Sequence, residues 1–399
     1  MRLLIPLFLT ASSFATESLV SDVAGFDRAA AAAKAGDVIV LKNGEWKDAR
    51  LKIRASGSEE SPVTVRAQTA GKALLTGDSR LQVGGRFVLV EGLHFQNPTS
   101  EEAIELRIDS DEVAQECRIT QCAVVSTQPS AENGKKTHFI SLYGREHRVD
   151  HCRFAGKTSE GPMMVVWLSE EHQEWGRHRI DHNHFGPREP LGRNGGETIR
   201  LGDSKTSLLN AECLVEHNLF EKCDGEAECI SNKSCGNTYR RNTFLEVSGT
   251  LTLRHGNRCL VEKNAFLGNE AKGTGGVRII GEGHVVRGNY FEKLTGDRER
   301  SPLCLMAGIP DTPLNGYAQV KDARIDDNLF IGCEHSVAFS YAGHKNATLK
   351  PLNTQVSGNY FTTAKPDDLD EHPYMYWEQK DLKKPAWVDQ REPAGPTWK

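Results

Sequence analysis

One pattern of hydrophobic and polar positions recurs along most of the chain. It consists of an apolar residue, two further residues, usually Asn, one more residue, and then usually Phe. Looser copies have Cys122 and Cys152 at the Asn position. The ten copies end at Phe95, Val124, Phe154, Phe185, Phe220, Phe244, Phe266, Phe291, Phe330 and Phe361. A fixed internal spacing with a variable interval between copies is typical of a solenoid.

The interval between copies predicts which solenoid this is. It ranges from 22 to 39 residues, and the shortest intervals suit one coil of a parallel β-helix, with loops inserted elsewhere. Asn at a turn tolerates the left-handed conformation and can bond its neighbours in the stack. Leucine-rich repeats would need a different leucine spacing and helical return segments, and propeller blades would be longer and more uniform. We therefore predict an all-β, single-domain right-handed parallel β-helix.

Both ends of the chain differ from this pattern. Residues 1–15 have the charge, apolar core and small residues of a signal peptide, although they could instead form a buried first strand. Residues 26–35 are rich in alanine and predict a short helix that ends at Gly36 and covers the open end of the solenoid. We expect the β-helix domain to cover residues 16–370. Residues 371–399, rich in proline and charge, would pack on its exterior.

Composition excludes several classes of protein. The 399 residues carry a formal net charge of −5 and contain no basic block, so nothing indicates nucleic-acid binding. After the N-terminus, no apolar stretch is long enough to span a membrane. The ten cysteines follow no CxxC spacing, and we expect most of them to be buried and unpaired.

Chargeable residues fall at similar positions in four successive coils. Counted from the preceding Phe of the repeat, the residues that share this sector are Asn194, Glu226, Glu228, Lys233, Arg254 and Arg278. Because coils stack about 4.8 Å apart, these side chains should gather in one cleft. The long insertions before Phe220 and Phe330 would form its walls.

The residue types in this sector suggest chemistry. Glu226 and Glu228 are two apart, so on a strand both carboxylates would point to one face and favour a hard cation such as Ca²⁺. A solvated acidic edge strand is the alternative. Lys233 near a cation could act as a base, and Arg254 could stabilise negative charge. His255 should point away from Arg254 unless the strand bends.

Four segments resemble polysaccharide lyase family 6, which includes alginate lyases and chondroitinase B. They are NGGETIR (194–200), DGEAECISNKS (224–234), LRHG (253–256) and GGVRIIGEGH (275–284). The resemblance implies that Asn194, Glu226 and Glu228 bind Ca²⁺. It further implies that Lys233 is the catalytic base and Arg254 the catalytic acid. The substrate-binding residues that it implies are His255, Arg278 and Arg200.

The function implied is calcium-dependent β-elimination of a 4-linked uronic-acid polysaccharide, most of all alginate. Dermatan sulfate is the second substrate considered. A hydrolase would need a pair of carboxylates as acid and base, and the basic residues in register argue against it. A non-catalytic module that binds acidic glycan would need none of these residues. We expect a secreted or periplasmic monomer.

Overall fold

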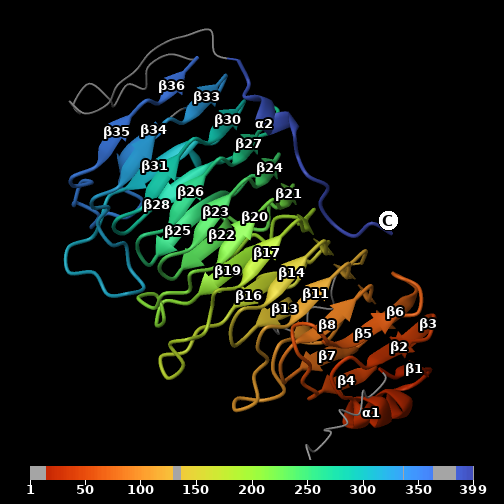
Figure 1. The fold of residues 1–399 in the computed structure, drawn as a ribbon. Coiled ribbons are helices and arrows are strands. Elements are labelled where there is room, and N and C mark those ends of the chain that lie inside the picture. Colours follow the sequence, from red (N-terminus) through yellow and green to blue (C-terminus); the bar gives the residue numbers. More distant parts are fainter. Residues whose placement is uncertain (1–14, 129–135, 336, 363–382, 399) are drawn as a thin grey trace, which may run out of the picture.

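The chain folds as a parallel β-helix. The computed structural model describes residues 15–128, 136–335, 337–362 and 383–398, and its strands form three parallel sheets of 13, 12 and 11 strands (Figure 1). Successive strands along most of the chain belong to different sheets, so each coil adds one strand to each sheet. The predicted parallel β-helix is confirmed.

We call the sheets A, B and C. Sheet A consists of β1 (Glu17–Val20), β2 (Val38–Leu41), β5 (Val63–Ala67), β8 (Val88–Glu91), β11 (Arg118–Thr120), β14 (Arg148–Asp150), β17 (Arg179–Asp181), β20 (Leu214–Glu216), β23 (Thr238–Arg240), β26 (Leu260–Glu262), β29 (Val285–Arg287), β32 (Arg324–Asp326) and β35 (Gln355–Ser357). Sheet B consists of β3 (Gly44–Lys47), β6 (Ala73–Thr76), β9 (His94–Gln96), β12 (Ala123–Val125), β15 (Arg153–Ala155), β18 (His184–Phe185), β21 (Leu219–Glu221), β24 (Thr243–Leu245), β27 (Ala265–Leu267), β30 (Tyr290–Glu292), β33 (Leu329–Ile331) and β36 (Tyr360–Phe361). Sheet C consists of β4 (Arg50–Ile53), β7 (Arg80–Val83), β10 (Glu102–Glu105), β13 (His138–Leu142), β16 (Met164–Val166), β19 (Ile199–Gly202), β22 (Glu228–Lys233), β25 (Thr250–His255), β28 (Val277–Ile279), β31 (Leu303–Met306) and β34 (Val337–Tyr341).

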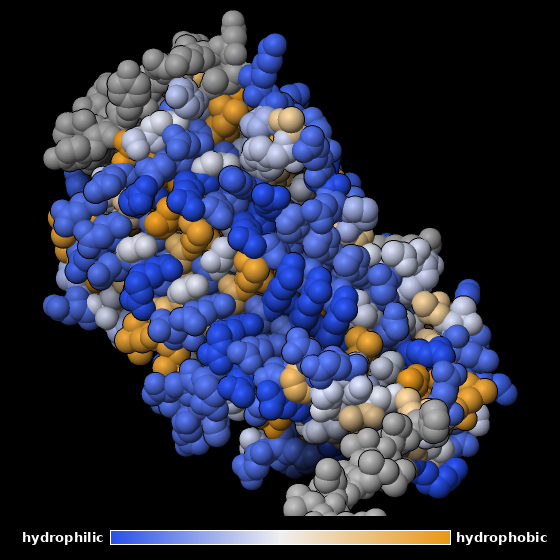
Figure 2. All heavy atoms as spheres, in the orientation of Figure 1, coloured by the Kyte–Doolittle hydropathy of each residue, from blue (hydrophilic) through white to orange (hydrophobic). Residues whose placement is uncertain are grey.

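The Phe of the repeat lies on sheet B and points into the core. From Phe154 to Phe361 these rings stack on one another with centroids 4.4 to 5.3 Å apart. Burial of each ring contributes about 1.5–3 kcal/mol. Because apolar side chains fill the interior, the face seen in Figure 2 is mostly hydrophilic, with hydrophobic residues in small groups.

The Asn of the repeat forms a second buried ladder at the corner between sheets A and B. Asn218, for example, donates its side-chain N–H to Oδ1 of Asn242 at 3.0 Å and to the carbonyl of Ile180 at 2.8 Å. The left-handed residue, however, is the one before Asn: φ is 54° at His217 and 53° at Arg241. The repeat therefore does not use the tolerance of Asn for this conformation, whereas the expected bonding between neighbouring Asn residues is present. Asn instead satisfies backbone groups that the turn leaves unpaired.

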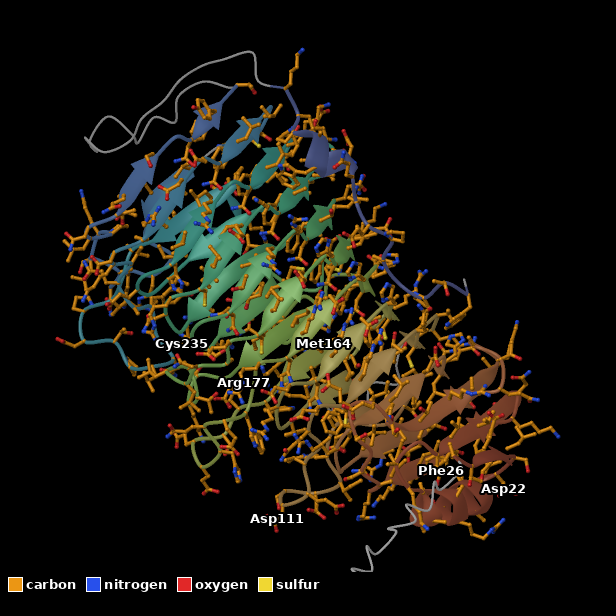
Figure 3. The ribbon with its side chains drawn as sticks, in the orientation of Figure 1. Asp22, Phe26, Asp111, Met164, Arg177 and Cys235 are labelled. Carbon is orange, nitrogen blue, oxygen red and sulfur yellow. The ribbon has the colours of Figure 1, made fainter. Side chains whose placement is uncertain are left out.

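A helix covers the first coil, but its bounds differ from the prediction. Helix α1 (Val23–Ala32) follows β1, and the side chain of Asp22 accepts a hydrogen bond from the backbone N–H of Gly25. This N-cap starts the helix three residues earlier than expected, and the helix ends before Gly36. Phe26 is fully buried and points toward the end of the β-helix (Figure 3).

The described C-terminal segment lies along the outside of the β-helix. Helix α2 (Ala386–Asp389) packs Val388 against Ala265 and Tyr290 of sheet B. Farther on, the Trp398 indole N–H donates to the carbonyl of Gln121 at 2.7 Å. The segment therefore runs back over several coils toward the N-terminal end (Figure 1). The expected signal segment lies almost entirely outside the described residues, and the expected domain boundaries stay a prediction.

The cysteines are small core residues. All ten are buried and unpaired. Cys122 and Cys152 occupy the Asn position in two early coils, and burial raises the pKa of Cys152. Among the described residues, no helix is long and apolar enough to cross a membrane.

Candidate active site

Seven of the eight predicted site residues line one open cleft on sheet C. The cleft measures about 820 Å³ and lies over β22, β25 and β28. Residues of the two long insertions, among them Arg193 and Tyr317, also line it. The predicted residues in the cleft are Asn194, Glu226, Glu228, Lys233, Arg254, His255 and Arg278. The six residues expected to share one sector of four successive coils, all of these except His255, do come together in the cleft.

The eighth residue, Arg200, lies elsewhere. It pairs with Ser231 across sheet C, and its guanidinium lies 4.9 Å from the ring centroid of Trp167. Trp167 in turn stacks on Tyr143 at 5.8 Å. Arg200 is not among the residues that line the cleft, and its role as a substrate contact stays a prediction.

Glu226 is held by the loop of the preceding coil, which contains Gly195 and Gly196. Oε2 of Glu226 accepts hydrogen bonds from the backbone N–H groups of Gly195 at 2.9 Å and Gly196 at 3.3 Å. A Cβ at Gly196 would lie 2.2 Å from the carbonyl oxygen of Gly225, so only glycine lets the two loops approach this closely. Glu226 precedes β22, so the expectation of two carboxylates on one strand is wrong for this residue. Both carboxylates nevertheless reach the cleft.

A buried arginine supports these loops from below. Arg188 is almost completely buried, and its guanidinium donates to the carbonyls of Glu197 at 2.5 Å and Gly195 at 3.2 Å. It also donates to the carbonyls of Ser159 and Gly161, both at 3.0 Å. Burial lowers the pKa of Arg188 to about 10. One cation therefore ties together the loops of two successive coils beneath the cleft.

Glu197 is a site residue that was not predicted, although it lies within the NGGETIR segment. Its side chain is buried, lines the cleft, and has an Oε2 atom without a hydrogen-bond partner among the described residues. Burial, together with the charges of Glu197 and Glu228, raises the pKa of Glu226 to about 7. Three crowded carboxylates and an unpaired buried oxygen fit a hard cation with oxygen ligands, to which Asn194 could add an amide oxygen.

Glu228 lies between the acidic and the basic side of the cleft. Arg278 donates a hydrogen bond to its Oε1 atom, and Nε of Arg254 lies 3.7 Å from the same oxygen. The Arg278 side chain is only 7% exposed, so its main partner in this structure is Glu228. Ser231 also donates to Glu228, at 2.5 Å. Glu228 is therefore fixed by three neighbours.

An irregularity in the strand pairing brings the basic residues together. Asn232 pairs with Leu253, but Lys233 pairs with His255, so Arg254 is an extra residue in β25. Such a bulge re-aims neighbouring side chains, and both Arg254 and His255 line the cleft. The expectation that His255 points away applied only to a regular strand. Burial and the charges of Arg254 and Lys233 lower the pKa of His255 to about 3, so its ring is neutral.

The insertion after β31 fixes Arg254. Nη1 of Arg254 donates a hydrogen bond to the carbonyl of Gly316 at 2.7 Å, and the Arg254 guanidinium lies 4.3 Å from the ring centroid of Tyr317. Burial lowers the pKa of Arg254, although the charge of Glu228 opposes this. Lys233, in contrast, is half-buried at the end of β22, and no hydrogen bond or ion pair from another described residue holds its ammonium group. No sequence signal pointed to Tyr317, because this residue comes from a distant loop.

Comparison with known proteins identifies the family. The chondroitinase B family model matches residues 20–375. The PL6 alginate lyase AlyGC is 36% identical, with a TM-score of 0.87 over 96% of this chain. A mannuronic-acid-specific family 6 lyase from the human gut microbiota is 28% identical, with a TM-score of 0.82 over 96% of this chain and 97% of its own. No curated protein matches.

The parallel β-helix and these matches together define the class of protein. The chain belongs to polysaccharide lyase family 6. It spans 57% of the length of AlyGC.

Proposed function

We propose that the protein is a calcium-dependent polysaccharide lyase that cleaves a 4-linked uronic-acid polysaccharide, alginate in the first place, by β-elimination. One observation carries the proposal: Lys233 and Arg254 line the same cleft as Glu197, Glu226 and Glu228. Membership of family 6, and the similarity to solved alginate lyases, support the reaction class and the substrate.

In the proposed reaction, the Lys233 amine removes the proton from C5 of the uronate. The electron pair left at C5 forms a double bond to C4, and the bond between C4 and the glycosidic oxygen breaks. Arg254 donates a hydrogen bond or a proton to the departing oxygen. No water is added, and the new non-reducing end carries an unsaturated uronate.

The remaining residues bind and orient the substrate. Asn194, Glu226 and Glu228 would hold Ca²⁺, with Glu197 available as a further oxygen donor. When bound, the ion supplies Lewis-acid stabilisation to the substrate carboxylate, whose C5 proton is otherwise weakly acidic. His255 is neutral and can form hydrogen bonds to sugar hydroxyl groups. Arg278 would orient Glu228 through the hydrogen bond that it donates to that carboxylate.

Dermatan sulfate is the second candidate substrate, because the matching family model is named after chondroitinase B. The test is the ultraviolet absorbance of the unsaturated uronate on mannuronate-rich alginate, guluronate-rich alginate and dermatan sulfate. We expect absorbance to grow on alginate, to stop with a chelator and to return with Ca²⁺. Products one water heavier by mass spectrometry would instead indicate a hydrolase. Binding of alginate without any product would indicate a glycan-binding module.

We further propose that residues 1–15 direct export, and that the enzyme acts as a secreted or periplasmic monomer. Sequencing of the N-terminus of protein recovered outside the cytoplasm tests the first point. Light scattering in solution tests the second.

A further inference from the structure

A histidine pair and one glutamate meet outside the cleft, where the C-terminal segment crosses the corner between sheets A and B. His182 and His217 precede the ladder asparagines of adjacent coils, and their rings stack with centroids 5.0 Å apart. Glu392 belongs to the C-terminal segment. One ligand atom from each of the three side chains lies within 4.8 Å of the other two.

From this geometry we infer a second metal site, in which His182, His217 and Glu392 bind a transition-metal ion such as Zn²⁺ and fasten the C-terminal segment to the β-helix. Two imidazoles and one carboxylate suit zinc, whereas calcium prefers a larger set of oxygen ligands. This site shares no residue with the proposed catalytic cleft.

The two separations between the histidines and Glu392 are close to those of a zinc site. Nε2 of His182 lies 2.5 Å from Oε2 of Glu392, and Nδ1 of His217 lies 3.6 Å from Oε1 of the same carboxylate. Ligand atoms in a tetrahedral zinc site with bonds of about 2.0–2.2 Å lie roughly 3.3–3.6 Å apart. Glu392 would have to move about 1 Å away from His182. The ligand atoms of the two histidines, which lie within 4.8 Å of each other, would have to come closer together.

A carboxylate behind His182 orients its ring. Nδ1 of His182 lies 2.8 Å from Oδ2 of Asp181, and Asp181 in turn accepts a hydrogen bond from Arg148 at 2.7 Å. A carboxylate on the far nitrogen is how metal-binding histidines are commonly held. It directs the other nitrogen, Nε2, toward Glu392.

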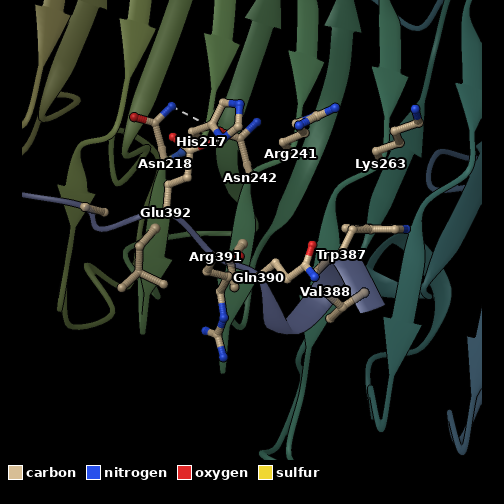
Figure 4. Close-up of a pocket in the computed structure, with 14 residues that line it drawn as sticks. His217, Asn218, Arg241, Asn242, Lys263, Trp387, Val388, Gln390, Arg391 and Glu392 are labelled. Atoms are coloured by element: carbon tan, nitrogen blue, oxygen red, sulfur yellow. Dashed lines mark hydrogen bonds and ion pairs between the residues drawn. The ribbon is translucent and has the colours of Figure 1, made fainter. Parts of the chain in front are cut away.

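The surroundings allow access and fix the third ligand. A cavity of about 490 Å³ adjoins the cluster, and Figure 4 shows Glu392 beside His217 at its edge. The backbone N–H of Gly395 donates to the carbonyl of His182 at 2.8 Å. Glu392 is therefore anchored close to the histidines by its own segment, and a bound ion would replace the hydrogen bond between His182 and Glu392.

His151 provides a matched control. It occupies the same position one coil earlier, stacks on His182 at 5.0 Å, and has its Nδ1 2.8 Å from Oδ2 of Asp150. It is not part of the three-residue cluster that could hold a metal. His151→Ala therefore removes a similar histidine but leaves the three proposed ligands intact.

The experiment measures Zn²⁺ binding to the full-length protein without an affinity tag, in excess Ca²⁺ so that the cleft is saturated. We expect one Zn²⁺ more per chain for the wild type and His151→Ala than for Glu392→Gln and His217→Ala, or binding weakened at least about tenfold in the latter two. Zn²⁺ should also slow proteolysis of the C-terminal segment in the wild type and in His151→Ala, but not in Glu392→Gln or His217→Ala. Equal Zn²⁺ binding by the wild type and Glu392→Gln, an exposed change that does not threaten folding, would overturn the inference. The cluster would then be a hydrogen-bonded ion pair only.

Discussion

The backbone N–H of Gly195 donates a hydrogen bond of 2.9 Å to Oε2 of Glu226, a carboxylate from the next coil. This bond joins the two loops that shape the acidic side of the cleft. It depends on the close approach of Gly196 and Gly225, where neither position has room for a side chain. The binding of a cation should therefore be sensitive to changes that do not alter any ligand.

Gly196→Ala should separate these loops. Its Cβ would lie 2.2 Å from the carbonyl oxygen of Gly225, so the loops must move and Glu226 loses its backbone donors. We expect at least a tenfold weaker Ca²⁺ affinity, measured by calorimetry, because comparable losses follow from changes in groups that orient metal ligands. Arg193→Ala, an exposed change in the same loop that adds no atom between the two loops, is the control. Equal Ca²⁺ affinity of Gly196→Ala and the wild type would show that the loop contact does not matter.

The stabilisation by Ca²⁺ should depend on pH. Burial and two neighbouring carboxylates raise the pKa of Glu226 to about 7. A raised pKa in the folded state stabilises the metal-free protein at acidic pH, and this contribution is lost as pH rises from the ordinary carboxyl value through about 7. Since Ca²⁺ competes with this proton, it should raise the melting temperature by more at pH ~8 than at pH ~5. Glu226→Gln should remove most of the difference, whereas equal shifts at both pH values would argue against the proposed ligand.

Arg188→Met should destabilise the fold strongly. It leaves the carbonyls of Ser159, Gly161, Gly195 and Glu197 without their donor in a buried site. Breaking such a buried charged network costs about 3–5 kcal/mol, and denaturant unfolding would measure it. Arg193→Met is the control: that arginine is exposed and pairs with Glu160, so it should cost less than about 1 kcal/mol. Similar values for both variants would mean that Arg188 does not support the loops.

The Asn ladder should contribute to stability at each coil. Asn242→Ala removes the acceptor for Asn218 and the donor for the carbonyl of Val215, all of them buried. We expect a loss of about 2–5 kcal/mol in the free energy of unfolding. Asn210→Ala, which removes an exposed hydrogen bond from Arg258, should change it by less than about 1 kcal/mol. An equally small loss for Asn242→Ala would contradict a structural role for the ladder.

The coils could be predicted from the sequence because the residues that repeat are the ones that contact each other between adjacent coils. Asn and Phe recur because each stacks on its own copy in the next coil, as Asn218 does on Asn242 and Phe220 on Phe244. The same register placed in one cleft the six residues that it predicted to share a sector, from Asn194 to Arg278. The alanine-rich pattern did not predict where α1 begins, because the start depends on the N-cap hydrogen bond that the side chain of Asp22 accepts.

The parts of the site that were missed depend on irregular or distant contacts. The extra residue at Arg254 brings His255 to the cleft, and a regular alternation cannot predict a bulge. Tyr317 reaches Arg254 from a loop about sixty positions away. Glu197 lies beside a predicted ligand, but only its burial and its unpaired oxygen single it out.

The most direct test of the proposed lyase compares two lysines of the cleft, Lys233 and Lys272. Both variants, Lys233→Ala and Lys272→Ala, are assayed for unsaturated product on alginate with saturating Ca²⁺, after their melting temperatures have been matched to the wild type. Loss of a general base lowers kcat by about 10²–10⁴-fold, so we predict such a loss for Lys233→Ala and a change of less than about threefold for Lys272→Ala. If Lys233→Ala keeps the wild-type kcat, Lys233 is not the base and the proposed mechanism is wrong.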